Sequence, residues 1–138
     1  MKHLQTGESA TCSITARNLW NATGIEVDAG EEYALGAEGE WCDACIKTTP
    51  RGYSSAEAPF FSRILLPLFE KLRRRPADKW FVLVGAIGQN EAATFVIGDG
   101  LPSWKPAAKG ELNCFANDVR IAYGNNHGAV TLVVKRVR

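Results

Sequence analysis

The sequence predicts one all-β domain over residues 1–138, an antiparallel β-sandwich with a helical insertion, and three observations lead to this fold class. Short stretches of alternating apolar and polar residues recur, with turn residues between them about every 8 to 12 positions, as in sandwiches and barrels. Residues 80–88 are apolar at almost every position, which indicates a strand covered on both faces. Helical spacing is confined to residues 59–75, within a segment at 53–79 that interrupts the strands.

The N-terminal third of the chain has strand-like patterns separated by turns. Residues 9–17 alternate weakly and predict a first strand, and residues 24–27 predict a short second strand. Residues 33–41 then supply the next inward face. Because most tryptophan surface is buried in small domains, we expect Trp20 and Trp41 to lie in the core.

The predicted insertion follows residues 42–52, which have the composition of a loop. Its apolar residues recur at three- and four-residue steps: Phe60, Ile64, Leu65, Leu68, Phe69 and Leu72. Ser55 is the expected N-cap, and Pro67 should kink or split the helix. We expect this helical insertion to lie over one sheet and to cover the outer face of residues 80–88.

The C-terminal part returns to strand patterns. Residues 94–98 predict a strand, whereas residues 99–108 contain Gly, Ser and two prolines and predict a loop in which Trp104 can be exposed. The alternation at residues 112–116 and 130–134 predicts the last two strands.

Composition and charge exclude several classes of protein. The formal net charge is +1, so no strong field attracts nucleic acid, and we expect no nucleic-acid partner. The first nine residues lack the apolar core of a signal peptide, and no apolar run is long enough to cross a bilayer. We therefore expect a cytoplasmic protein without a membrane span, for which release from the cell would have to be non-classical.

The four cysteines are expected to be reduced thiols in that compartment. Cys12 and Cys114 lie on predicted strands and suit small core positions. Residues 41–45 read Trp-Cys-Asp-Ala-Cys, the beginning of a thioredoxin-type motif, but a loop composition follows where that chemistry requires a helix N-terminus. Neither a redox site nor a cysteine-based zinc site is favoured, because a second pair of ligands is missing.

The loop at residues 117–128, Asn-Asp-Val-Arg-Ile-Ala-Tyr-Gly-Asn-Asn-His-Gly, concentrates oxygen donors between two predicted strands. It contains the carboxylate of Asp118, the carboxamides of Asn117, Asn125 and Asn126, and two glycines. Such hard oxygen donors on a tightly turned backbone are typical Ca²⁺ ligands, although the spacing is not that of an EF-hand. The alternative is a plain hairpin connection, in which Asn and Gly are present because they tolerate positive φ.

Four pieces of sequence, in order, extend this observation to the whole chain. They are Trp20-Asn-Ala-Thr-Gly-Ile-Glu-Val-Asp-Ala-Gly30, Tyr33-Ala-Leu-Gly-Ala-Glu-Gly-Glu-Trp41, Gly85-Ala-Ile-Gly88 and the 117–128 loop. With them the chain resembles the LecA (PA-IL) family of calcium-dependent galactose-binding bacterial lectins, which are small β-sandwiches of the galactose-binding-like group. The resemblance runs from about residue 20 to the C-terminus, except for roughly residues 42–79. It implies a non-enzymatic, calcium-dependent module that binds galactosides.

The resemblance also implies site residues. Those implied for Ca²⁺, through side-chain or backbone oxygens, are Asp118, Ala122, Asn125, Asn126, Asp43 and Ala44. Those implied for the sugar are Asp118, Val119 and Asn125, because two sugar hydroxyls ligate the metal directly in such lectins. The family also uses a His and a Gln from its middle loop, and the segment at 42–79 has neither at a matching place. His127 matches no ligand and is expected to be a solvated turn residue.

Two alternatives remain at this stage. The same sandwich could be a non-catalytic protein-interaction or structural module that has lost sugar binding, and a helical insertion covering the Asp118 loop would favour this. An enzyme would need a nucleophile with a base or a pair of carboxylates, for which Glu38 and Glu40 are weak candidates. We also expect a homo-oligomer, because weak single sites gain from multivalency.

Overall fold

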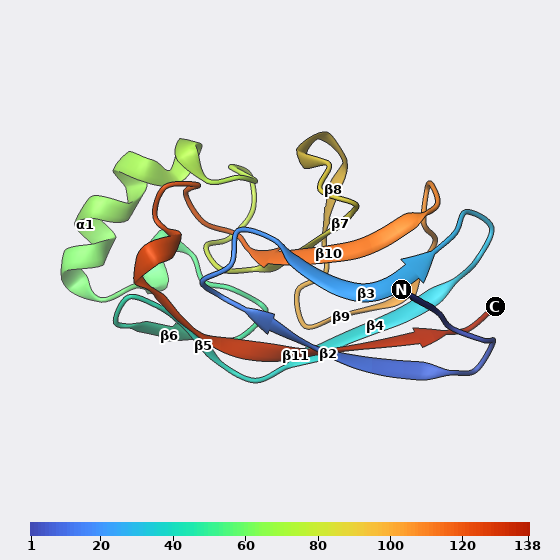
Figure 1. Cartoon of the computed structure of the whole chain (residues 1–138). Helices are drawn as coiled ribbons and strands as arrows, with labels where there is room; N and C mark the ends of the chain where they lie inside the picture. Colours follow the sequence, from blue (N-terminus) through green and yellow to red (C-terminus); the bar gives the residue numbers. More distant parts are fainter.

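Two β-sheets face each other in the computed structural model, which describes the backbone of residues 1–138 and every side chain except those of Phe60 and Phe61. The first sheet has the order β1-β3-β10-β7-β8, with bounds Lys2–His3 (β1), Asn21–Val27 (β3), Gly110–Ala116 (β10), Leu83–Ile87 (β7) and Thr94–Val96 (β8). Neighbouring strands in this sheet are antiparallel, except for β1 and β3, which are parallel. The all-β sandwich predicted from the sequence is confirmed (Figure 1).

The second sheet is built around the longest strand, β11 (Asn126–Arg136). Its order is β6-β5-β11-β4-β9, with β2 also paired to β11, and its bounds are Ile46–Thr48 (β6), Trp41–Asp43 (β5), Tyr33–Glu38 (β4), Gly100–Trp104 (β9) and Ser9–Thr15 (β2). Glu38 is opposite Thr131 and Trp41 is opposite Gly128, so β4 and β5 follow one another along the same side of β11.

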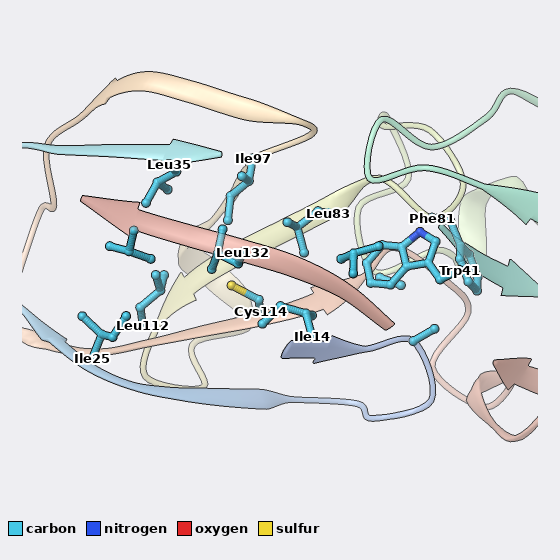
Figure 2. Packing of buried hydrophobic residues seen from close by; sticks show 14 of the residues in the cluster. Ile14, Ile25, Leu35, Trp41, Phe81, Leu83, Ile97, Leu112, Cys114 and Leu132 are labelled. Atoms are coloured by element: carbon cyan, nitrogen blue, oxygen red, sulfur yellow. The ribbon is translucent and has the colours of Figure 1, made fainter. Parts of the chain in front are cut away.

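The main core lies between the two sheets, where alternate residues of each strand point inward. On β11 the inward residues are Val130, Leu132 and Val134, which are almost completely buried, whereas Thr131 is exposed. Cys114 of β10 points into the same space as Leu132 (Figure 2). The strands predicted at residues 112–116 and 130–134 are therefore confirmed. Burial alternates with a period of two along residues 130–134 of β11, whereas residues 112–116 of β10 are buried on both faces.

The outer face of β7 and β10 is also covered, by Trp20 and by the end of the insertion. Val84 and Phe115 are fully buried beneath Trp20, whose ring contacts that of Phe115 edge-on at 5.1 Å between centroids. The Arg74 guanidinium lies 3.3 Å from the Phe115 ring centroid and 4.6 Å from that of Trp20. The prediction of a strand covered on both faces is confirmed. The insertion contributes to this cover through Arg74, which follows the helix, and the helix itself does not cross this face.

The insertion contains one α-helix between two short 3₁₀ helices. Its elements are η1 (Ser55–Glu57), α1 (Phe60–Phe69) and η2 (Glu70–Leu72). Ser54, not Ser55, caps the first 3₁₀ turn through a capping box with Glu57. The α-helix continues through Pro67 and ends at Phe69, so the predicted range of 59–75 was too long. Figure 1 shows α1 at one end of the sandwich, beside the loop between β10 and β11.

Two segments expected to be loops contain strands. Residues 42–52 contain most of the β5–β6 hairpin, which begins at Trp41, and residues 99–108 include β9. The strand β9 tolerates Pro102 because it lies at the edge of its sheet, where a missing N–H group leaves no neighbour unpaired. Trp104 is half-buried and stacks on Phe95 at 4.6 Å between ring centroids, so it is less exposed than its loop-like sequence suggests.

Two further 3₁₀ turns complete the fold, η3 (Glu91–Ala93) and η4 (Tyr123–Asn125).

All four cysteines are free thiols, and Cys114 is buried in the core as expected, whereas Cys12 is half-buried. Among the described residues, no helix is long and apolar enough to cross a membrane.

Gly52 marks the point where the insertion leaves the sandwich. The next residue, Tyr53, exchanges backbone hydrogen bonds of 2.8 and 2.9 Å with Trp80, so the chain leaves and returns at one place. Gly52 has φ of +74°, and a Cβ built on it would lie 2.4 Å from the Trp80 carbonyl oxygen.

We expect Gly52→Ala to lower the free energy of unfolding by about 2–5 kcal/mol, because it combines left-handed backbone strain with overpacking. Gly124→Ala is the matched control, since a Cβ there meets no atom within 4 Å. Urea unfolding of both variants measures the difference. Equal stability of the two variants would contradict the close backbone approach at Gly52.

Candidate functional site

Three polar side chains converge where β11 begins. The register of β11 with β5 places Asn126 opposite Asp43. Asp118, two residues after the end of β10, accepts a 3.0 Å hydrogen bond from the Asn126 side-chain amide. Asp118 and Asn126 lie near the two ends of the loop between β10 and β11, and Asp43 lies in β5, so the sandwich itself brings the two segments together.

The two carboxyl groups of this cluster are buried without a cationic side chain. Asp118 is 2% exposed and Asp43 is 9% exposed, and among the described residues neither forms an ion pair. Desolvation, with a smaller contribution from the charge of Asp43, raises the pKa of Asp118 to about 6. Desolvation also raises the pKa of Asp43, although the Tyr53 hydroxyl donates to its Oδ2 at 2.5 Å and favours the charged form.

The hydrogen bonds around the cluster leave one acceptor unused. The Asp118 Oδ1 atom accepts from the Val119 backbone N–H at 2.7 Å, and the Asn126 amide group also donates to the Ala16 carbonyl at 3.1 Å. The Asn126 Oδ1 atom is buried and has no partner among the described residues. An unpaired buried acceptor costs about 1–3 kcal/mol.

The donor set suits a hard cation. Two buried carboxyl groups with raised pKa values and an unpaired amide oxygen would all be stabilised by a cation that accepts oxygen ligands. In the described part of the chain no cluster of three or more His, Cys, Asp or Glu could hold a metal. A metal here would therefore have to use amide and backbone carbonyl oxygens as well, as Ca²⁺ does.

A cavity of about 260 Å³ lies against these carboxyl groups. Its lining residues are Asp43, Leu66, Phe69, Trp80, Asp118, Val119, Ile121, Ala122 and Asn125. Five of the residues implied by the lectin resemblance are in this set: Asp43, Asp118, Val119, Ala122 and Asn125. Ala44 lines a neighbouring cavity instead, and its N–H donates to the Asn125 carbonyl at 3.2 Å. Asn126 is not among the lining residues and is connected to the cavity through its hydrogen bond to Asp118.

The helical insertion forms one wall of this cavity rather than a roof over it. Leu66 and Phe69 of α1 line the cavity on one side, and Trp80 lines it where the insertion ends. Ile121, which lines the cavity from the loop, is 94% exposed, so the helix does not cover the loop at that residue.

Several residues of the site could not be found from sequence spacing. Tyr53, which binds Asp43, and Trp80, which donates from its indole nitrogen to the Ser55 hydroxyl at 3.0 Å, are brought near by the bridge that closes the insertion. Leu66 belongs to the predicted helical pattern, but the pattern does not say which face meets the loop.

Asn117 has a structural role and is not one of the oxygen ligands of the candidate site. Its Oδ1 atom accepts from the Arg75 backbone N–H at 2.9 Å, and its amide group donates to the carbonyls of Arg75, Asp78 and Lys79. It thereby holds the returning end of the insertion against the end of β10. His127 is exposed, in agreement with the expectation of a solvated residue, and Glu38 and Glu40 are exposed away from both cavities.

The raised pKa of Asp118 predicts a pH dependence of stability in metal-free protein. The folded state retains the Asp118 proton up to a pH of about 6, whereas an unfolded Asp loses it near pH 3.9. This contribution is fully present below about pH 4 and is lost as the pH rises through about 6, with a total of up to about 3 kcal/mol.

Chelator-treated protein should therefore lose free energy of unfolding between pH 4 and 6, measured by urea titration, and Asp118→Asn should flatten that slope. Asp99→Asn is the control, because Asp99 is 62% exposed at its side chain. An Asp118→Asn variant with the slope of the wild type would show that Asp118 ionises normally in the folded protein.

Comparison with known proteins adds information about the fold. No protein-family model matches the sequence, and no curated protein matches it. Among solved structures, the chain is similar to a domain described as "EclA N-terminal domain; PllA-like lectin", with a TM-score of 0.68 and 21% identity. The match covers 91% of this chain and 94% of that domain. The all-β sandwich of this chain is thus similar in fold to that domain.

Proposed function

We propose that this protein is a calcium-dependent carbohydrate-binding module of lectin type that binds galactosides. The observation that carries the proposal is the pair of buried carboxyl groups, Asp43 and Asp118, which line an open cavity without a cationic partner among the described residues. The likeness of the whole fold to a PllA-like lectin domain supports a carbohydrate as the class of ligand. No nucleic-acid partner is proposed, because the formal net charge is only +1.

The proposed Ca²⁺ site uses oxygens from two segments. Asp118, Asn125 and Asn126 would contribute side-chain oxygens, and Ala122 a backbone carbonyl. The β5–β6 hairpin would contribute the Asp43 carboxylate and the Ala44 carbonyl. A bound Ca²⁺ would offset the charge of the two buried carboxylates and offer coordination positions to neutral hydroxyl oxygens.

The saccharide would lie in the cavity beside this group. Asp118 and Asn125 can accept hydrogen bonds from sugar hydroxyls, and Val119 borders them in the same lining. Leu66, Phe69 and Trp80 offer an apolar wall for the C–H face of a sugar ring. A mostly apolar cavity with a few convergent polar groups is the usual form of a small-molecule site.

Calcium should stabilise the wild-type protein against heat, because a ligand that binds only the folded state stabilises it by about 2.7 kcal/mol at a hundred times its Kd. We expect Asp118→Ala to abolish this stabilisation. We expect Asn125→Ala to lower the calcium affinity about tenfold, which corresponds to about 1.4 kcal/mol for the loss of one neutral ligand. Asn125 is exposed and its side chain makes no hydrogen bond to a described residue, so its variant should fold normally.

His127→Ala is the control for this experiment, since His127 is exposed in the same loop and is not a proposed ligand. Differential scanning calorimetry and calorimetric titration of chelator-stripped protein measure both effects. A calcium-induced shift of Tm that survives Asp118→Ala would refute the proposed site.

Galactosides should release heat only when calcium is present. Titration of methyl galactoside into calcium-loaded wild-type protein should show binding that chelator removes and that Asn125→Ala weakens, because the proposed sugar contact passes through the metal and Asn125. Heat from calcium but from no sugar would favour the second candidate, a protein-interaction module on the same sandwich. The observation in favour of that candidate is the exposed apolar surface of α1.

A further inference from the structure

The helix α1 presents its apolar side to solvent. Five large apolar residues of α1 and the adjoining turn η2 are 47–72% exposed, and together we call them the apolar stripe: Ile64, Leu65, Leu68, Phe69 and Leu72. At 100° per residue these positions fall within one side of the helix. In a monomeric globular protein such a stripe normally faces the core.

The opposite side of the helix is the one held against the protein. Leu66 packs on the main core and lines the cavity, and Glu70 accepts a 2.5 Å hydrogen bond from the buried Ser55 hydroxyl. The Trp80 indole N–H donates to the same Ser55 hydroxyl, so this contact connects the helix end to the sandwich. These contacts fix the rotation of the helix, and the apolar stripe cannot turn inward without breaking them.

Ile121 extends the exposed apolar surface beyond the helix. It is 94% exposed and lines the same cavity as Phe69, so the loop and the helix contribute to one surface. The exposed apolar surface of these residues is comparable to the largest patches on typical monomers, which are about 300–600 Å². Patches of this size are often functional, and larger contiguous ones mark interaction sites.

We infer that the apolar stripe is the interface of a symmetric dimer of this chain. An antiparallel pairing of two α1 helices across a two-fold axis would place Leu65 of one copy beside Leu68 of the other, and Ile64 beside Phe69. One patch then meets the same patch, as an isologous contact requires. Two such patches bury on the order of 1,000 Å², which is the lower limit for a specific interface and indicates a weak, concentration-dependent dimer.

The dimer does not depend on calcium or sugar, so it is tested in chelator without saccharide. Sedimentation velocity of the wild type over roughly three decades of concentration around the micromolar range should show the mean mass rising from 15.0 kDa toward twice that value. Leu68→Asp should keep the mass at that of one chain throughout, because it would place two carboxylates in the apolar contact. Leu68 is 72% exposed, so the variant should fold, as its thermal melting would show.

Val137→Asp is the matched control, because Val137 is an exposed apolar residue outside the stripe and should leave the dimer intact. Hydrogen exchange of the amides at residues 64–72 should also slow as the wild-type concentration rises. A wild type that stays monomeric, a Leu68→Asp variant that dimerises as strongly as the wild type, or association that continues beyond two copies would each overturn the inference. If the wild type stays monomeric and sediments with phosphatidylcholine vesicles while Leu68→Asp does not, the apolar stripe is a membrane contact and not a dimer interface.

Discussion

Where β11 pairs with β5, Asn126 is placed opposite Asp43, and the geometry of the candidate site depends on this pairing. The next requirement is met by β10, which ends two residues before Asp118 and delivers that carboxyl group to the same place. Strands are rigid elements, so the cluster is preorganised without the helix. The energetic consequence is that two carboxyl groups are desolvated together. Among the described residues, no cationic side chain pairs with them to offset this desolvation cost.

The fold class could be predicted from the sequence because the signal for a sandwich is local. Alternation along β10 and β11 identifies their inward faces, and a helical spacing identifies α1. The failures arose where context overrides local preference. Pro102 suggested a loop, but an edge strand needs no N–H group at that position. The part of the insertion that covers the outer sheet face could not be identified, because Arg74 reaches Phe115 through a tertiary contact that has no periodic signature.

The candidate site was predictable to a different degree. The loop could be recognised as a source of oxygen ligands from its Asp and Asn residues, yet composition does not distinguish Asn117, which ties down backbone, from Asn126, which has an unpaired oxygen beside Asp118. Tyr53 and Trp80 were missed because they lie 27 residues apart in sequence and meet only when the insertion closes. Such long-range pairs follow from the completed fold, not from spacing.

The bridge between Tyr53 and Trp80, with the Asn117 contacts to Arg75, Asp78 and Lys79, gives the insertion a narrow neck. Because both of its ends are fastened to the sandwich at this neck, the intervening chain can change in length or content at little entropic expense to the remaining structure. The wall of the cavity that comes from α1 is therefore an exchangeable part. Substituting another segment between the same anchor points would alter what the cavity accepts while leaving the carboxyl pair in place, which makes the neck a natural grafting point for engineered selectivity.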